Sequence, residues 1–162
     1  MPKPIFDEKR YISTKENAKK LYDAFKATKC KALGDQVVVF NAEGFNHLIY
    51  TKRKERGKFD QIGRLNCLYF APKILELTTT IQETQEGMID TVVKKYGKKV
   101  TETKTIKYWA FIAIMGDRRI KVVVRKIGNG QIEFRSICPI WKTKRYGNAI
   151  VRELSTEDLE EA

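Results

Sequence analysis

The sequence predicts an α+β fold in which N-terminal helices pack on one face of an antiparallel β-meander of about four strands. Apolar residues recur at helical spacing in the first half of the chain. The second half carries three runs rich in β-branched and aromatic residues, separated by turn signals. Helices followed by strands are typical of α+β domains, and 162 residues suffice for one core.

The helical half begins with Ser13-Thr14-Lys15-Glu16, which matches a capping box and predicts a helix over about residues 14–29. A short strand is expected at 37–40. Asn41 can then cap a second helix of about ten residues. A third helix should follow the charged connection 52–60 and be interrupted by Pro72.

The strands are expected at 106–115, 119–127 and 131–138, with tight hairpins at Gly116-Asp117 and Asn129-Gly130. The polar segment 82–105 should hold a strand, a loop around 97–99 and the start of the next strand. The two turns predict five cross-strand pairs: Trp109 with Val124, Tyr108 with Arg125, Val123 with Ser136, Arg125 with Phe134, and Lys126 with Glu133.

This register divides the sheet into two faces. The face expected under the helices holds Trp109, Phe111, Ala113, Ile120, Val122, Val124 and Ile137. The opposite face holds Tyr108, Lys121, Arg125, Phe134 and Ser136. Since a sheet with one apolar face usually has a solvated second face, this basic and aromatic face would suit a nucleic acid.

The domain organisation expected is one nuclease-like domain over residues 1–150, with a helical extension at 1–35, and an acidic, disordered tail at 151–162. Residues 153–162 carry five acids and no base. Such a tail could compete weakly with RNA for the basic face, although a solvated tail is the simpler interpretation.

The net charge of +12 and the isoelectric point of about 9.6 favour an anionic partner, most simply a nucleic acid. The longest apolar run, 108–115, is too short to span a bilayer, and the N-terminal residues lack a signal-peptide core. A cytoplasmic protein without a membrane partner is therefore expected. Three widely spaced cysteines predict neither a zinc site nor a disulfide framework, so no cofactor or metal is expected.

His47 is the only histidine and lies beside a dense run of cations. Its spacing to Thr51 and Lys54 places all three on the outward face of a continuous helix, which would leave the imidazole accessible. Histidine transfers protons near neutral pH, and arginine and lysine bind phosphates. The simpler alternative is a surface or capping histidine on a basic protein.

The segment 37–75, with its Gly-Phe-Asn-His-Leu-Ile motif, the later Tyr108-Trp109 and the Phe134-Arg135-Ser136-Ile137 strand, resembles the phage-associated branch of the barnase–EndoU–colicin–RelE-like nucleases. The resemblance covers about residues 36–140. It implies a metal-independent ribonuclease acting through the ribose 2′-OH. The family's histidine would fall on His47, its basic residues on Arg53, Arg56 and Arg64, and its strand hydroxyl on Ser136. The chain departs from the family in lacking a second histidine and an evident glutamate base.

The predicted function is therefore endoribonuclease activity that leaves a 2′,3′-cyclic phosphate, as in a toxin or mobile-element nuclease. The catalytic candidates are His47, Arg64, Arg125, Ser136 and Tyr108. The candidates for RNA backbone contacts are Lys52, Arg53, Lys54, Arg56, Lys121, Lys142, Lys144 and Arg145. Arg64 could instead simply pair with Asp60, and Tyr108 could simply pack.

The alternative function is a non-catalytic RNA-binding or regulatory module on the same scaffold. A DNA-binding regulator is disfavoured because no helix-turn-helix is evident. RNA is the expected partner, and an acidic antitoxin or immunity protein is a further candidate. The sequence leaves the oligomeric state open.

Overall fold

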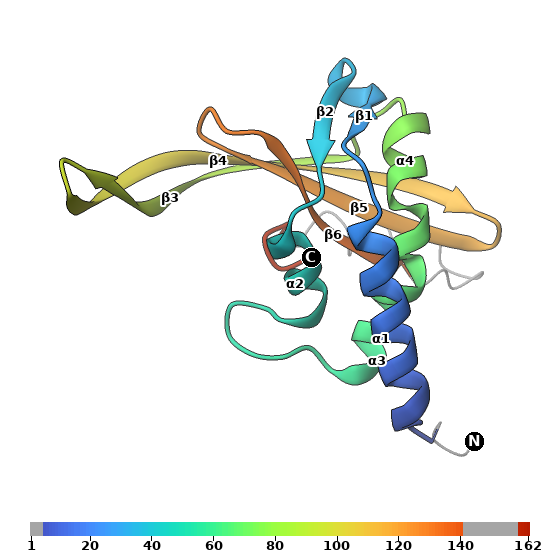
Figure 1. Cartoon of the computed structure of the whole chain (residues 1–162). Helices are drawn as coiled ribbons and strands as arrows, with labels where there is room; N and C mark the ends of the chain where they lie inside the picture. Colours follow the sequence, from blue (N-terminus) through green and yellow to red (C-terminus); the bar gives the residue numbers. More distant parts are fainter. Residues whose placement is uncertain (1–4, 141–158) are drawn as a thin grey trace.

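The computed structural model describes residues 5–140 and 159–162. In chain order the elements are α1 (Glu8–Asp23), β1 (Thr28–Cys30), η1 (Lys31–Leu33), β2 (Gln36–Val39), α2 (Ala42–Ile49), α3 (Lys58–Cys67), η2 (Leu68–Phe70), α4 (Ala71–Leu77), β3 (Glu83–Lys95), β4 (Lys98–Met115), β5 (Arg118–Ile127) and β6 (Ile132–Ile140). The α+β class is thus confirmed, with the helices packed against a six-stranded sheet (Figure 1).

The sheet has the strand order β1-β2-β6-β5-β4-β3. Strands β3 to β6 form the expected antiparallel meander. Strands β1 and β2 widen the sheet beyond the predicted four strands, because β2 pairs in parallel with β6 through Val38 and Val39. Figure 1 also shows the β3–β4 hairpin projecting away from the rest of the molecule.

The first helix begins six residues earlier than its capping-box pattern predicts. The side chain of Asp7 accepts a hydrogen bond from the backbone N–H of Arg10 at 3.2 Å and caps α1. Asn41 caps α2 as expected, accepting from the N–H of Gly44 at 3.0 Å.

Helix α1 belongs to the main core rather than lying apart from it. Tyr22 is 3% exposed, and its ring centroid lies 5.4 Å from that of Phe45 and 5.9 Å from that of Phe134. Its hydroxyl donates to the carbonyl of Asn41. This aromatic cluster joins α1, α2 and β6, and it holds α2 in a fixed position against the sheet.

Gly44 allows α2 to approach β6 closely. A Cβ at this position would lie 2.6 Å from the carbonyl oxygen of Phe134 and 2.6 Å from the hydroxyl of Tyr22. Only glycine fits this contact without a shift. His47 lies one helical turn further along α2, so the same close contact fixes where the imidazole lies relative to the sheet.

The predicted register is confirmed around the first turn and is partly wrong around the second. Trp109 pairs with Val124 and Tyr108 with Arg125, as expected. Between β5 and β6, Lys126 pairs with Ile132 and Arg125 pairs with Glu133, so each partner lies one residue away from the predicted one. The reason is that the connection around Asn129-Gly130 is longer than two residues. A β-bulge between Val123 and Val124 restores the predicted pair of Val123 with Ser136.

The helix-covered face of the sheet is confirmed, whereas the opposite face is not solvated as predicted. Phe134 belongs to the helix-covered core. Four other residues assigned to the open face are at most 6% exposed: Tyr108, Lys121, Arg125 and Ser136. A second apolar cluster covers part of this face, and it includes Leu159 and Ala162 from the predicted tail.

Candidate functional site

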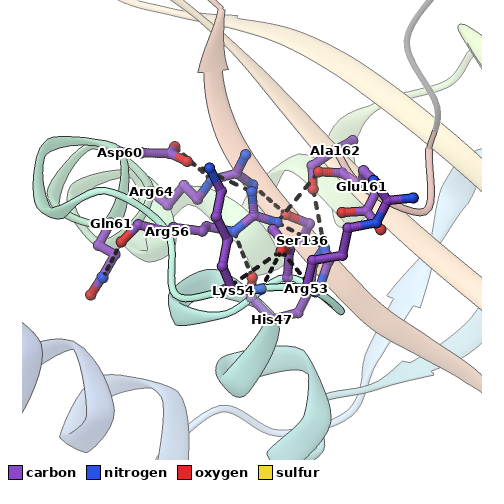
Figure 2. A network of polar contacts seen from close by, with 11 residues as sticks. His47, Arg53, Lys54, Arg56, Asp60, Gln61, Arg64, Ser136, Glu161 and Ala162 are labelled. Carbon is purple, nitrogen blue, oxygen red and sulfur yellow. Dashed lines mark hydrogen bonds and ion pairs between the residues drawn. The ribbon is translucent and has the colours of Figure 1, made fainter.

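Four of the residues singled out from the sequence meet where α2 and α3 approach β6. Arg56 donates from Nε to the carbonyl of His47 at 2.9 Å, and its Nη2 lies 3.0 Å from the His47 Nε2. Arg64, on α3, donates from Nη1 to the hydroxyl of Ser136 at 2.8 Å and from Nε to Asp60 at 2.8 Å. Figure 2 shows this network, which joins α2, α3 and β6.

His47 is buried, at 4% exposure, and the prediction of an accessible imidazole is wrong. Helix α2 ends at Ile49, so Thr51 and Lys54 do not continue the helix face that carries His47. The pKa of His47 is lowered to about 3, first by burial and then by the positive charges of Arg135 and Arg56. The imidazole is therefore neutral at physiological pH.

Residues 159–162, the covering segment, close this site. Its main chain approaches two site residues: the oxygen of Ala162 lies 3.3 Å from the His47 Nε2, and the oxygen of Glu161 accepts from Arg56 at 3.4 Å (Figure 2). The N–H of Leu159 donates to Oε1 of Gln85 at 2.8 Å. Residues 159–162, part of the tail that was expected to be disordered, are thus packed against the protein. Residues 151–158 of that tail lie outside the described residues.

The covering segment is held by burial and by charge. Leu159 and Ala162 are each 1% exposed and pack in the cluster that contains Tyr108, Ala110 and Val123. Glu160 forms an ion pair with Lys52. An acidic segment therefore rests on cations that sequence reasoning assigned to RNA.

A cavity of about 430 Å³ lies beside His47. One side of the cavity is formed by α2 and the loop that follows it, and the other side by the sheet, at the root of the β3–β4 hairpin. Its lining residues are Glu43, Asn46, His47, Tyr50, Thr51, Lys52, Ile89, Thr91, Arg125, Ile127 and Arg135. Two arginines and a lysine against one carboxylate make it a cavity suited to an anion.

Arg135 is a site residue that the sequence reasoning missed. It is 8% exposed, and its Nε has no hydrogen-bond partner among the described residues. In the predicted register, residue 135 shares the helix-covered face with Ile137. In the structure Phe134 lies on that face instead, and the bulge in the β5–β6 ladder leaves Arg135 on the cavity side. The sequence did carry a signal for this bulge, because an arginine at a strand position predicted to face the apolar core indicates an irregularity in the strand.

Glu43 is the second missed residue. It lies one turn before His47 on α2, so its carboxylate faces the same cavity. The carboxylate accepts a hydrogen bond from Nη2 of Arg125 at 2.6 Å. Arg125 also bonds to Glu133, and its charge is therefore balanced by two carboxylates in direct contact.

The remaining candidates are more scattered. Lys121, expected to contact RNA, is fully buried and pairs with Glu83 at 3.1 Å, which corrects that prediction. Ser136 has no exposed surface and Tyr108 is 2% exposed, so neither can touch RNA in this arrangement. Arg53 and Lys54 lie exposed on the loop after α2. The predicted contacts Lys142, Lys144 and Arg145 lie outside the described residues.

Comparison with protein-family models, curated proteins and solved structures yields no match to this chain. Over residues 5–140 and 159–162, no group of three or more His, Cys, Asp or Glu side chains is placed to hold a metal ion. No helix in the same part of the chain is long and apolar enough to cross a membrane. Cys30, Cys67 and Cys138 are buried, and they form no disulfide among the described residues.

Proposed function

We propose that the chain is an endoribonuclease that needs no metal ion and uses His47 at the cavity wall. The observation that carries this proposal is that His47 and Arg135 line one cavity, and that the buried Nε of Arg135 has no hydrogen-bond partner among the described residues. A guanidinium so placed can bind a phosphodiester oxygen. The resemblance to phage-associated nucleases supports the same activity, in the cytoplasm.

The proposed reaction joins the ribose 2′-oxygen to phosphorus while the bond from phosphorus to the 5′-oxygen breaks. Neutral His47 accepts the proton of the 2′-OH, and the leaving 5′-oxygen takes a proton from water. The products are a 2′,3′-cyclic phosphate and a free 5′-OH. Arg135 and Arg125 face the cavity and can stabilise the extra negative charge on the phosphoryl oxygens.

Arg56, Arg64 and Ser136 have positioning roles in this scheme. Arg56 holds the carbonyl of His47. Arg64 is itself held by Ser136 and Asp60, so α3 is tied to β6 behind the imidazole. None of the three needs to contact RNA, which agrees with their burial at 7% exposure or less.

The reaction requires that the covering segment moves away. In the closed arrangement one ring nitrogen faces two partners: Nε2 can donate to the oxygen of Ala162 or accept from Arg56, but not both at once. Release of the segment would expose the ring and remove part of the burial that lowers its pKa, and the imidazole would become a stronger base. An acidic antitoxin or immunity protein could bind the same cations.

A non-catalytic RNA-binding module is the second candidate. Its support is the burial of His47 and Ser136, since a site that stays closed could bind RNA at its rim without cutting it. The two functions differ in what His47 does. A nuclease loses cleavage but keeps RNA binding when His47 is replaced, whereas a binding module cuts no RNA in any variant.

The test is incubation of structured and unstructured RNA with the full chain in excess chelator, followed by analysis of the 3′ ends. The same RNA carrying 2′-O-methyl riboses is the control, because it lacks the attacking hydroxyl. Cleavage of RNA alone, with cyclic phosphate ends and dependence on His47, would support the nuclease. Cleavage of both substrates would exclude the proposed reaction.

A further inference from the structure

The end of the β3–β4 hairpin, residues 89–104, projects from the rest of the described chain, and we call it the arm (Figure 1). From the pair of Ile89 with Lys104 to the pair of Lys95 with Lys98, the two strand segments pair only with each other within the described chain. Six residues of strand extend about 20 Å. A two-stranded ribbon of this kind has little stability of its own.

The arm's tip places like charges opposite one another. Lys94 pairs across the ribbon with Lys99, and Lys95 pairs with Lys98. Directly opposed like charges destabilise a ribbon. Among the described residues, Lys95 is the one of these four lysines that forms an ion pair, with Glu102, and residues 93–100 contain no acid. The cluster is unfavourable to the free ribbon and favourable to a polyanion along it.

The turn residue is also a poor choice for stability. Tyr96 has φ of 52° and the following Gly97 has φ of 75°, which is the arrangement of a type I′ turn. That turn prefers Asn, Asp or Gly at its first central position, and positive φ is uncommon for a bulky side chain. Tyr96 is nonetheless fully exposed, at 102%. An exposed aromatic ring on a strained turn is suited to stacking on a base.

Protection of the sheet edge is the simpler explanation for lysines on an outer strand. It does not account for the arm, because the lysines lie on both strands. Met88 and Val92 on the edge strand are also exposed, at 68% and 67%. A strand selected to protect the sheet edge would not expose apolar side chains.

The root of the arm leads into the candidate site. Ile89 and Thr91 line the cavity together with His47 and Arg135, so one face of the ribbon continues into the cavity wall. A strand of nucleic acid whose phosphate lies in the cavity would pass along this face toward the lysines. This continuity favours RNA, the proposed substrate, over a separate duplex DNA partner.

We infer that the arm is an RNA-binding element that holds the substrate strand outside the cavity by lysine contacts to phosphates and by stacking on Tyr96. This inference rests on the proposed RNA specificity of the site. It implies that substrates are long: an RNA that only fills the cavity cannot reach the tip about 20 Å away.

The sharpest variant is Tyr96→Asn in the full chain. Asn before Gly is the preferred type I′ pair, so the turn should be as stable as before or more stable, with an unchanged or raised Tm. Binding of a single-stranded RNA of about 20 nucleotides should nevertheless weaken roughly five- to a hundredfold, the range expected for one lost base stack. The probe carries 2′-O-methyl riboses so that cleavage does not interfere, and binding is read by fluorescence anisotropy. Unchanged affinity would overturn the stacking role.

The lysine contacts are tested by replacing Lys94, Lys95, Lys98 and Lys99 together with alanine. The logarithmic salt dependence of binding should fall by about two to three units, because each phosphate contact on a single strand contributes roughly 0.7. The matched control replaces four exposed lysines near the opposite edge of the sheet: Lys20, Lys26, Lys29 and Lys31. Equal losses of slope in both variants would overturn the inference, since net charge alone would then explain binding.

Length and substrate type complete the test. An RNA of about four nucleotides should bind the arm variants and the intact chain equally. A preference for duplex DNA that the lysine variant abolishes would replace RNA with DNA as the partner. No binding of RNA by the intact chain would overturn the inference. Failure of the nuclease proposal looks different: arm-dependent RNA binding would persist without any cleavage.

Discussion

The main-chain oxygen of Ala162 lies 3.3 Å from Nε2 of His47, 115 positions away in the sequence. The contact places an acidic segment over the one imidazole of the chain. It makes the proposed nuclease a closed enzyme in the described arrangement, whose activity depends on how readily residues 159–162 leave.

Replacing Leu159 by aspartate should release the covering segment. Leu159 is 1% exposed, and an aspartate carboxylate at this position would have to lose its hydration among apolar side chains. We expect the rate of RNA cleavage by the full chain to rise at least about tenfold, equivalent to about 1.4 kcal/mol. Initial rates on a fluorogenic RNA measure this.

The matched control is Leu77→Asp, the same chemical change at a leucine that is 62% exposed. It should leave the rate unchanged. Glu160→Lys, which opposes Lys52 instead of pairing with it, should raise the rate without altering the apolar cluster. If neither Leu159→Asp nor Glu160→Lys is faster than the intact chain, the segment does not limit access.

The titration of His47 should report whether the site is open. In the intact chain its pKa is about 3, because burial and the charges of Arg135 and Arg56 disfavour the imidazolium. In Leu159→Asp it should move toward the ordinary value of about 6.5. NMR of the imidazole carbon-bound protons measures both directly, since the chain has one histidine. An ordinary pKa in the intact chain would mean that the ring is not covered in solution.

The same shift links folding to pH. Between the lowered pKa of His47 near 3 and its ordinary value, the unfolded chain binds a proton that the folded chain does not. Folding is therefore less stable as pH falls through this window, by at most about 1.4 kcal/mol per pH unit from this group. Urea unfolding of the intact chain and of His47→Gln isolates the contribution, because the carboxylates titrate in both. Parallel pH profiles would contradict it.

Two glycines in helices should respond oppositely to alanine. Gly44→Ala should cost about 1–3 kcal/mol, because its Cβ would lie 2.6 Å from a β6 backbone oxygen. At Gly63 on α3 a Cβ would meet Pro139 at an ordinary 3.5 Å, so Gly63→Ala should be neutral or stabilise by up to about 1 kcal/mol. Chemical unfolding distinguishes them. A mild Gly44→Ala would mean that α2 is not tightly held on β6.

Ser136 should matter for stability rather than for RNA contact. Its hydroxyl accepts from the buried guanidinium of Arg64 at 2.8 Å, and Ser136→Ala leaves that N–H without its partner. The expected loss is about 1–3 kcal/mol, with RNA affinity unchanged. Thr84→Ala, an exposed hydroxyl on β3, is the control and should stay within about 0.5 kcal/mol. Weaker RNA binding with intact stability would instead place Ser136 in contact with substrate.

Local patterns predicted the fold well where one signal dominated. Asn41 was recognisable as a helix cap, and the Gly116-Asp117 turn gave the register of β4 and β5. The start of α1 was harder to predict, because two residues could cap it. Asp7 rather than Ser13 is the N-cap in the structure. Asn129-Gly130 indicated a hairpin but not the length of its loop. The longer loop shifts the register of β5 and β6 by one residue, and the bulge at Val123 and Val124 then offsets this shift.

The candidate site was predictable in part: Glu43 and Arg135 were missed, and so was the burial of the residues that were found. His47 and Arg56 were identified in the basic stretch, Arg64 through the family resemblance, and Ser136 through both that resemblance and the register. The burial of His47 and Arg56 depends on contacts between distant segments, among them the covering segment, whose Leu159 and Ala162 pack against β4 and β5. No local pattern predicts such a contact, because an acidic stretch in isolation is better solvated than packed.

The most direct test of His47 as the proton acceptor compares Leu159→Asp with the double variant Leu159→Asp/His47→Ala on RNA in excess chelator. The opened single variant should release 2′,3′-cyclic phosphate ends. The double variant should be slower by about 10²–10⁴-fold, the usual contribution of an acid–base group, while binding uncleavable RNA equally well. Equal cleavage by both variants, or none by either, would contradict a nuclease site at His47.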